Sequence, residues 1–322
     1  MKKILITGIG GDLGQSISRV ISESFPDFKI FGTDINNINS GYLFCEELFI
    51  ISSAFRNSYI HELSKLIIDL NIDLLIPSTE IELNLISKFL IDEKLFGIRV
   101  LGIFEEISTI GEDKYFTNQW LNKIGVVVPK TWLFSEQNKN KINILISNFG
   151  NLILKKRTGS GSRNIYKLKK YSDIPSYVFK NPSEWIVQEF LPEEEGEYTI
   201  AVSLLENDLK YIQFKRSLRF ASTHFAEVVD IYEIQKLVEK IVKNLNKDCV
   251  FNIQLRLKNG MPMIFEINPR FSSTVYARHI LGFPDLAIWV AHTLNLSSNL
   301  KFYFKKGTKF SRYFCYKVIS QT

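Results

Sequence analysis

Phe251-Asn-Ile-Gln-Leu-Arg-Leu257 and Met263-Ile-Phe-Glu-Ile-Asn268 are the two segments that decide the fold. The odd-numbered positions of both segments are apolar, whereas most of the even-numbered positions are polar. A period of two is typical of β-strands that bury one face. Asn259-Gly260-Met261 lies between the segments, so we expect a β-hairpin with a three-residue turn.

The polar face of this hairpin carries oxygen ligands. If both odd-numbered sets face one core, Gln254 lies opposite Glu266, and Asn268 follows on the same face. Amide and carboxylate oxygens suit Mg²⁺, whose remaining ligands are commonly water and phosphate oxygens. Arg270 follows directly after Pro269 and could bring a positive charge to the same phosphates. The alternative, a solvated face of an edge hairpin, is disfavoured by the tight run Phe-Glu-Ile-Asn-Pro-Arg-Phe.

At these residues the chain resembles the ATP-grasp superfamily, in particular the carbamoyl-phosphate synthase large subunit and its single-unit carboxylate–amine ligase relatives. The family hairpin reads Asn-x-Gln and then Glu-x-Asn-Pro-Arg, which matches Gln254, Glu266, Asn268 and Arg270. The resemblance implies that Glu266 bridges two Mg²⁺ ions, with Gln254 on one side and Asn268 on the other, and that Mn²⁺ can substitute. Arg270 would be a catalytic residue.

Other motifs of the family follow in the expected order. Gly111-Glu-Asp-Lys114 resembles the start of the ATP-grasp unit, Leu152-Ile-Leu-Lys155 the phosphate-binding strand, and Gly159-Ser-Gly-Ser-Arg163 the glycine-rich loop. Val187-Gln-Glu-Phe-Leu191 resembles the linker that holds adenine, and Glu197 matches a ribose-binding acid. The resemblance therefore assigns ATP binding to Lys114, Lys155, Gly159, Ser160, Gly161, Ser162, Gln188, Glu189, Phe190, Leu191 and Glu197.

Two residues depart from the family pattern. Lys156 stands where the family usually has Pro, and Asn164 where Gly is common. We expect a higher local charge and a stiffer loop, without loss of a proposed ligand.

Arg216 and Arg219 are further catalytic candidates. They lie on or just after a predicted strand, in a region that borders the carboxylate and acyl-phosphate pocket in related enzymes. A basic strand is more often a solvated face, which is the alternative interpretation. The four histidines are scattered, and we expect none of them to act in catalysis.

The N-terminal hundred residues alternate apolar strand-like runs with amphipathic helices, which predicts a Rossmann-like parallel sheet. Thr7-Gly-Ile-Gly-Gly-Asp-Leu-Gly14 follows the first strand, and Asp34 ends the second, as in short-chain reductases that bind NAD(P). Tyr166-x-x-x-Lys170 and Tyr211-x-x-x-Lys215 have the spacing of the reductase pair. Both tyrosines fall in strand-like sequence, so we favour a loop that closes the sheet without a cofactor.

The predicted fold class is α/β with α+β lobes. We expect a Rossmann-like domain at 1–110, a small α+β lobe at 111–187 that opens with one helix from Gly111 to Ile124, and a larger antiparallel lobe at 188–322. The three parts correspond to an ATP-grasp fold with its preceding domain.

The composition limits the remaining function classes. Forty basic and 34 acidic residues give a net charge of +6, which suits a small polyanion such as ATP. No basic cluster with interleaved aromatic residues indicates nucleic acid, and no apolar run indicates a membrane span. The three cysteines are far apart and predict neither a disulfide framework nor zinc, so we expect a cytoplasmic protein.

The resemblance implies an ADP-forming ligase. A carboxylate would attack the γ-phosphate of ATP, and an amine or similar nucleophile would displace phosphate from the acyl phosphate. The substrates are then two small molecules whose identity the sequence leaves open, as it does the oligomeric state, for which a homodimer is one option. A reductase and an ATP-binding protein without ligase activity are the alternatives.

Overall fold

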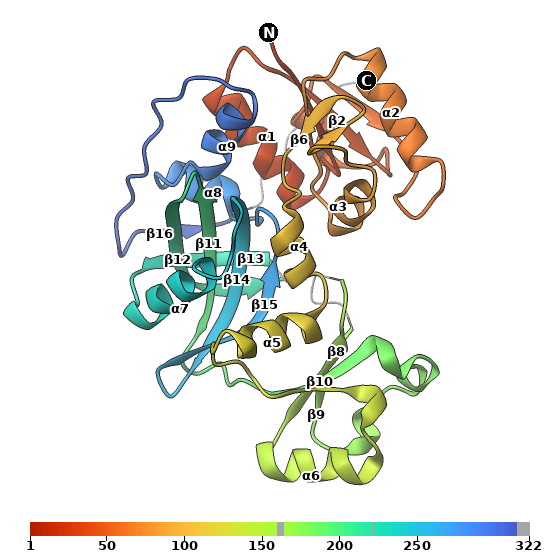
Figure 1. Ribbon diagram of the computed structural model, residues 1–322, viewed down its shortest axis with the longest axis vertical. Helices are drawn as coiled ribbons and strands as arrows, with labels where there is room; N and C mark the ends of the chain where they lie inside the picture. The colour runs from red at the N-terminus through yellow and green to blue at the C-terminus, as the bar shows by residue number, and fades with distance from the viewer. Residues whose placement is uncertain (160–163, 221, 314–322) are drawn as a thin grey trace. The chain divides into compact units, whose positions relative to one another are not determined.

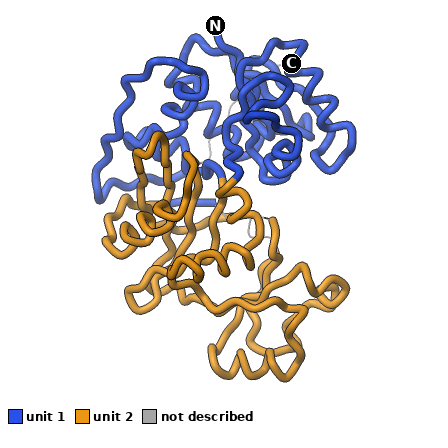
Figure 2. The backbone as a smooth tube through the Cα atoms, viewed as in Figure 1, with its two compact units in different colours: residues 1–105, 222–225, 270–322 blue, residues 106–221, 226–269 orange. Residues whose placement is uncertain are grey.

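The computed structural model describes residues 1–159, 164–220 and 222–313. The chain divides into two compact units, shown in Figure 2. Unit 1 comprises residues 1–105, 222–225 and 270–322, and unit 2 comprises 106–221 and 226–269.

Unit 1 is built on a sheet of six strands in the order β3-β2-β1-β4-β6-β5. Five of the strands are parallel and β5 is antiparallel. The strand order changes direction at β1, which has β2 on one side and β4 on the other, so this is a topological switch point. The N-terminal glycine loop, residues 7–14, follows this strand. The strands are β1 (Lys3–Thr7), β2 (Lys29–Asp34), β3 (Glu47–Ile50), β4 (Leu74–Ile76), β5 (Lys94–Leu95) and β6 (Ile98–Val100).

Helices pack on this sheet because their apolar residues recur at helical spacing and so form one apolar face on each helix. Leu63 and Ile67 of α2 and Ile86 of α3 pack with Leu5 and Leu75 of the sheet in one buried core. Helices α8 and α9 contact α1. The helical and remaining elements of unit 1 are α1 (Asp12–Ser24), η1 (Ser40–Leu43), α2 (Tyr59–Asp69), α3 (Glu80–Ser87), α8 (Val275–Ile280), α9 (Asp285–Thr293) and β16 (Lys309–Ser311).

Unit 2 contains an antiparallel sheet of four strands in the order β7-β10-β8-β9. Helix α6 begins at the Asn138 side chain, which caps Lys141 N, and ends at Gly150 with φ 76°. Figure 1 shows α6 in the same part of the molecule as β8, β9 and β10. The helix contributes Ile142 to a core with Leu152, Leu154 and Trp185. The elements are β7 (Thr131–Leu133), η2 (Phe134–Glu136), α6 (Lys139–Phe149), β8 (Leu152–Lys156), β9 (Ile165–Leu168), η3 (Tyr171–Asp173), η4 (Ser176–Lys180), η5 (Pro182–Glu184) and β10 (Trp185–Glu189).

A second sheet has six strands in the order β15-β14-β11-β12-β13-β16. The pairs from β15 to β12 are antiparallel, as the sequence predicted for the larger lobe. Strand β13 begins in unit 1 and continues in unit 2. The elements are β11 (Glu197–Leu205), β12 (Asp208–Arg219), β13 (Ser222–Val229), α7 (Tyr232–Val242), β14 (Cys249–Lys258) and β15 (Met261–Asn268).

The predicted helix from Gly111 to Ile124 is confirmed from Lys114 to Lys123, but its predicted start at Gly111 is wrong. The segment is broken between α4 (Glu105–Gly111) and α5 (Lys114–Lys123). Asp113 starts α5, because its carboxylate accepts the N–H groups of Tyr115 and Phe116. A Cβ atom at Gly111 would lie 2.9 Å from Pro269 Cδ and 3.0 Å from Ile267 O, so only glycine allows α4 to end this close to β15.

The division of the chain into three lobes at residues 110 and 187 stays a prediction. None of the described helices is both long and apolar enough to cross a bilayer.

Candidate functional site

The predicted pairing of the hairpin is confirmed where the proposed metal ligands lie. Gln254 of β14 is opposite Glu266 of β15, and Asn252 is opposite Asn268. Asn268 is buried, and Glu266 keeps 19% of its side chain exposed. The two strands therefore place the three proposed metal ligands, Gln254, Glu266 and Asn268, on one face, together with the amide of Asn252.

The predicted three-residue turn is wrong. Lys258 pairs with Met261, so the turn contains only Asn259 and Gly260, whose φ angles are 52° and 72°. Positive φ at both residues is typical of the type I′ turn that Asn-Gly favours. A β-bulge between the pairs Gln254–Glu266 and Leu255–Ile264 leaves Phe265 without a partner in the ladder and restores the predicted register beyond it.

The bulge gives Lys155 its hydrogen-bond acceptor. Lys155 is 5% exposed on β8, and its Nζ donates to the Phe265 carbonyl oxygen at 3.1 Å. Burial lowers the pKa of Lys155 to about 7, Glu266 opposes this shift, and Lys114 adds to it. The Phe265 carbonyl and the Glu266 carboxylate offset only part of the cost of burying the Lys155 ammonium. A phosphate would therefore be a favourable partner for it.

Lys114 approaches the same carboxylate from the first turn of α5. Its Nζ lies 3.5 Å from Glu266 Oε1 and donates to the carbonyl oxygen of Gly159, where the glycine-rich loop begins. Asp113 fixes this end of the helix through Arg157, whose Nε lies 3.0 Å from Asp113 Oδ2. The structure thus brings together Lys114, Lys155 and Glu266, which lie far apart in the sequence.

Arg216 of β12 also reaches the hairpin. Its Nη2 donates to Gln254 Oε1 at 2.9 Å and to Glu197 Oε1 at 2.7 Å. Arg256 of β14 binds the other oxygen of Glu197, with Nη2 at 2.9 Å from Oε2. Glu197, the predicted ribose acid, is therefore shared by two arginines.

The predicted adenine linker lies at the end of β10. The Gln188 amide donates to Thr131 Oγ1, and the carboxylate of the buried Glu189 accepts Lys130 N and the Lys258 ammonium. Phe190 follows, with Lys167 Nζ 3.9 Å from its ring centroid, and the Leu191 carbonyl accepts Arg256 Nη1. These contacts order the linker.

The remaining candidates are placed differently. Arg270 belongs to unit 1, where its Nη2 donates to Glu80 Oε1 at 2.9 Å. Arg219 ends β12, and its guanidinium lies 5.3 Å from the ring of the exposed Phe220. Ser160, Gly161 and Ser162 lie outside the described residues. Catalytic roles for Arg216, Arg219 and Arg270 stay predictions.

Sequence reasoning missed Arg256, Phe265 and the pair Asp113–Arg157. Arg256 occupies an even-numbered position of the polar strand face, so the alternation that selected Gln254 could have selected it. The role of the Phe265 carbonyl depends on a β-bulge that the residue pattern did not predict. Asn164, which replaces a usual glycine, has φ 58°, a left-handed conformation that Asn tolerates.

The donor set fits Mg²⁺ bound to a nucleotide. In the part of the chain that the structure describes, no group of three or more His, Cys, Asp or Glu residues could hold a metal. A site with one carboxylate and two amides suits a hard cation that takes further oxygen ligands from phosphate, and two lysines beside it supply the positive charge for those phosphates.

The N-terminal glycine loop is closed by its own contacts. Asp34 Oδ2 accepts Gly10 N at 3.0 Å, and a Cβ atom at Gly14 would lie 2.6 Å from Gly8 O. Tyr166 lies on β9 and Tyr211 on β12, rather than on the helix that a reductase requires.

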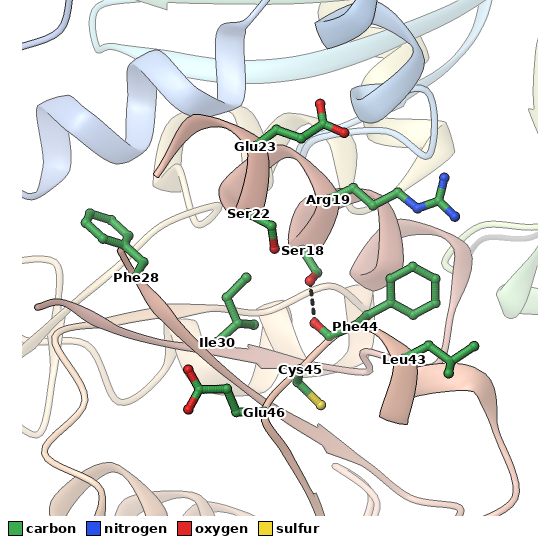
Figure 3. A pocket seen from close by; sticks show the side chains of 10 residues that line it. All are labelled: Ser18, Arg19, Ser22, Glu23, Phe28, Ile30, Leu43, Phe44, Cys45 and Glu46. Carbon is green, nitrogen blue, oxygen red and sulfur yellow. Dashed lines mark hydrogen bonds between the residues drawn. The ribbon is translucent and has the colours of Figure 1, made fainter. Parts of the chain in front are cut away.

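A pocket of about 410 Å³ in unit 1, shown in Figure 3, is lined by residues between positions 18 and 46, including Arg19, Glu23 and Cys45.

Comparison with known proteins agrees with this geometry. The model of the ATP-grasp domain family matches residues 111–274. The uncharacterized protein MG011 homolog of Mycoplasma pneumoniae is 26% identical over 145 residues, which are 44% of this chain and 48% of that protein. The chain thus spans about half the length of this curated relative.

Two solved structures show the same fold. Carboxyaminoimidazole ribonucleotide synthase from Aspergillus clavatus, in complex with ATP, superposes with a TM-score of 0.72 at 14% identity, covering 94% of this chain and 78% of the other. The biotin carboxylase domain of Hydrogenobacter thermophilus 2-oxoglutarate carboxylase, in complex with MgADP, ADP and bicarbonate, gives a TM-score of 0.70 at 13% identity, covering 94% and 71%. With the family match over half of its residues, the chain belongs to the ATP-grasp family.

Proposed function

We propose that the protein is an ATP-dependent ligase that joins a small carboxylate to an amine or similar nucleophile, through an acyl phosphate, and releases ADP and phosphate. The observation that carries this proposal is the meeting of Lys114, Lys155 and Glu266 beside the Gln254 and Asn268 amides. Both the family and its solved neighbours with bound ATP or MgADP support it.

The proposed site has one group of residues for the metal and another for the phosphates. Glu266, Gln254 and Asn268 would hold Mg²⁺, as two ions that Mn²⁺ can replace, and the metal would neutralise phosphate charge and orient the γ-phosphate. Lys155 and Lys114 would hold the phosphates from the other side. Such positioning and charge neutralisation are the main demands of phosphoryl transfer.

The nucleotide would lie along the linker 188–191, with its ribose toward Glu197. Arg270, Arg216 and Arg219 would serve the carboxylate or the transferred phosphate. We propose a cytoplasmic location for the protein. We further propose three lobes, at 1–110, 111–187 and 188–322. A homodimer is the assembly to test first.

The test is a screen of paired carboxylates and amines for ADP release, with mass spectrometry of the product. Glu266→Ala and Lys155→Ala should abolish substrate-dependent ADP release while circular dichroism stays that of the wild type. Wild-type rates in both variants would contradict the proposal. Tight ATP binding without turnover on any pair would instead favour an ATP-binding protein without ligase activity.

A further inference from the structure

Glu197 is the centre of a charge chain that it forms with Arg216 and Arg256, and all three side chains are partly buried. It lies on β11 between two neighbouring strands, opposite Arg216 on β12 and opposite Arg256 on β14. Arg216 donates from Nε and Nη2 to Oε1, at 3.1 and 2.7 Å. Arg256 donates from Nε and Nη2 to Oε2, at 3.1 and 2.9 Å. The three side chains are only 8–18% exposed.

The two ends of this charge chain, Arg256 and Arg216, reach different parts of the site. Arg256 Nη1 donates to the carbonyl oxygen of Leu191 at 2.8 Å, in the linker that follows β10. Arg216 Nη2 donates to Gln254 Oε1 at 2.9 Å, on the hairpin that carries Glu266. Hydrogen bonds therefore run without interruption from the linker backbone to a proposed metal ligand.

The hydrogen bonds make this charge chain rigid. Four N–H donors converge on one carboxylate, which has about four lone-pair positions, so each arginine is held in a fixed fork. If Arg256 is lost, Glu197 keeps only one partner and can turn with Arg216, and the Gln254 amide loses its fixed orientation. Loss of a hydrogen bond that orients a metal ligand commonly weakens metal binding about 10- to 100-fold.

We propose that Arg256 is a positioning residue that, through Glu197 and Arg216, couples the nucleotide linker to the metal-binding amide of Gln254. The proposal rests on the proposed function, since it assumes that the hairpin binds Mg²⁺ together with a nucleotide. It adds that the affinity for Mg²⁺ depends on a residue that need touch neither the metal nor the phosphates.

The experiment compares ADP binding with and without metal, by calorimetry on the full chain. The readout is the metal enhancement, defined as the Kd for ADP in EDTA divided by the Kd in Mg²⁺. Arg256→Met should lower this ratio about tenfold. Arg256→Lys keeps the charge without the fork, and should lower it about threefold. A role confined to ordering the linker would weaken ADP binding equally in both conditions and leave the ratio unchanged.

Lys210→Met is the matched control, because Lys210 lies on β12 in an exposed ion pair with Asp208. It should leave the ratio at the wild-type value. An unchanged ratio in Arg256→Met overturns the proposal, and if that variant does not fold, an unchanged ratio in Arg256→Lys does so. A wild type whose ADP binding does not respond to Mg²⁺ overturns the proposed function itself, and this proposal with it.

Discussion

Replacing Lys155 by methionine should stabilise the free protein while it removes nucleotide binding. Burial lowers the pKa of Lys155 from 10.5 to about 7. Since one pKa unit corresponds to ~1.4 kcal/mol, the buried ammonium costs roughly 4–5 kcal/mol at pH 7. Methionine removes that cost, but leaves the Phe265 carbonyl without its donor, a loss of about 1–3 kcal/mol. We therefore expect a net gain of about 1–4 kcal/mol at pH 7.

The gain should depend on pH in a definite direction. Because the folded-state pKa of Lys155 lies below its unfolded value, the unfolded chain binds more protons between about pH 7 and 10.5. The wild type therefore gains stability from this group as the pH rises through that window, by about 2 kcal/mol between pH 7 and 9. The advantage of the methionine variant should shrink by the same amount.

Urea unfolding of both proteins at pH 7 and 9 measures the effect. Tryptophan fluorescence is a suitable signal, since the buried Trp185 lies on β10 beside β8 in unit 2. Taking the difference between the two proteins cancels the titration of groups that they share, such as Cys45 and Cys249, whose pKa values burial raises to about 11 and about 12. A variant less stable than the wild type at pH 7, with the same difference at pH 9, would refute the reasoning.

Three further predictions concern the same structure. Binding of MgADP should raise the pKa of Lys155, so calorimetry in buffers of different ionisation enthalpy should show uptake of about 0.9 proton at pH 8; no uptake would place the phosphates elsewhere. Gly14→Ala should destabilise unit 1 by about 2–4 kcal/mol because its Cβ would meet backbone at 2.6 Å, whereas Gly260→Ala, which has open space, should cost only about 1 kcal/mol; equal shifts in Tm would contradict this. Arg278→Met should cost about 3–5 kcal/mol because it leaves the buried Asp285 unpaired, and adding Asp285→Leu should recover part of the loss in thermal unfolding; a double variant no more stable than the single one would argue against it.

The hairpin shows how far the sequence could predict the site. Alternation placed Gln254 opposite Glu266 because side chains must keep to one face of a strand. The same parity could not distinguish a three-residue turn from a two-residue turn followed by a bulge, since both give the same register beyond Phe265. The carbonyl group that holds Lys155 arises from that bulge, so it was beyond the reach of the pattern.

The charge chain shows why other parts were not predicted. Contacts of Arg216 with Glu197 and Gln254 depend on the registers of β11 with β12 and β14, which long strands of mixed residues do not specify by themselves. The pairing of Arg270 with Glu80 joins residues 190 positions apart. The break before α5 was readable, because Asp113 is a typical helix-capping residue.

The transfer of a carboxylate oxygen to phosphate tests the central claim most directly. Once the screen has identified a substrate pair, the carboxylate is labelled with ¹⁸O, and the phosphate released during turnover is examined by mass spectrometry. An acyl phosphate requires that one labelled oxygen leaves with each phosphate, and this is the result we predict. Phosphate without label, released in step with product, would contradict the assignment of the site to acyl-phosphate chemistry.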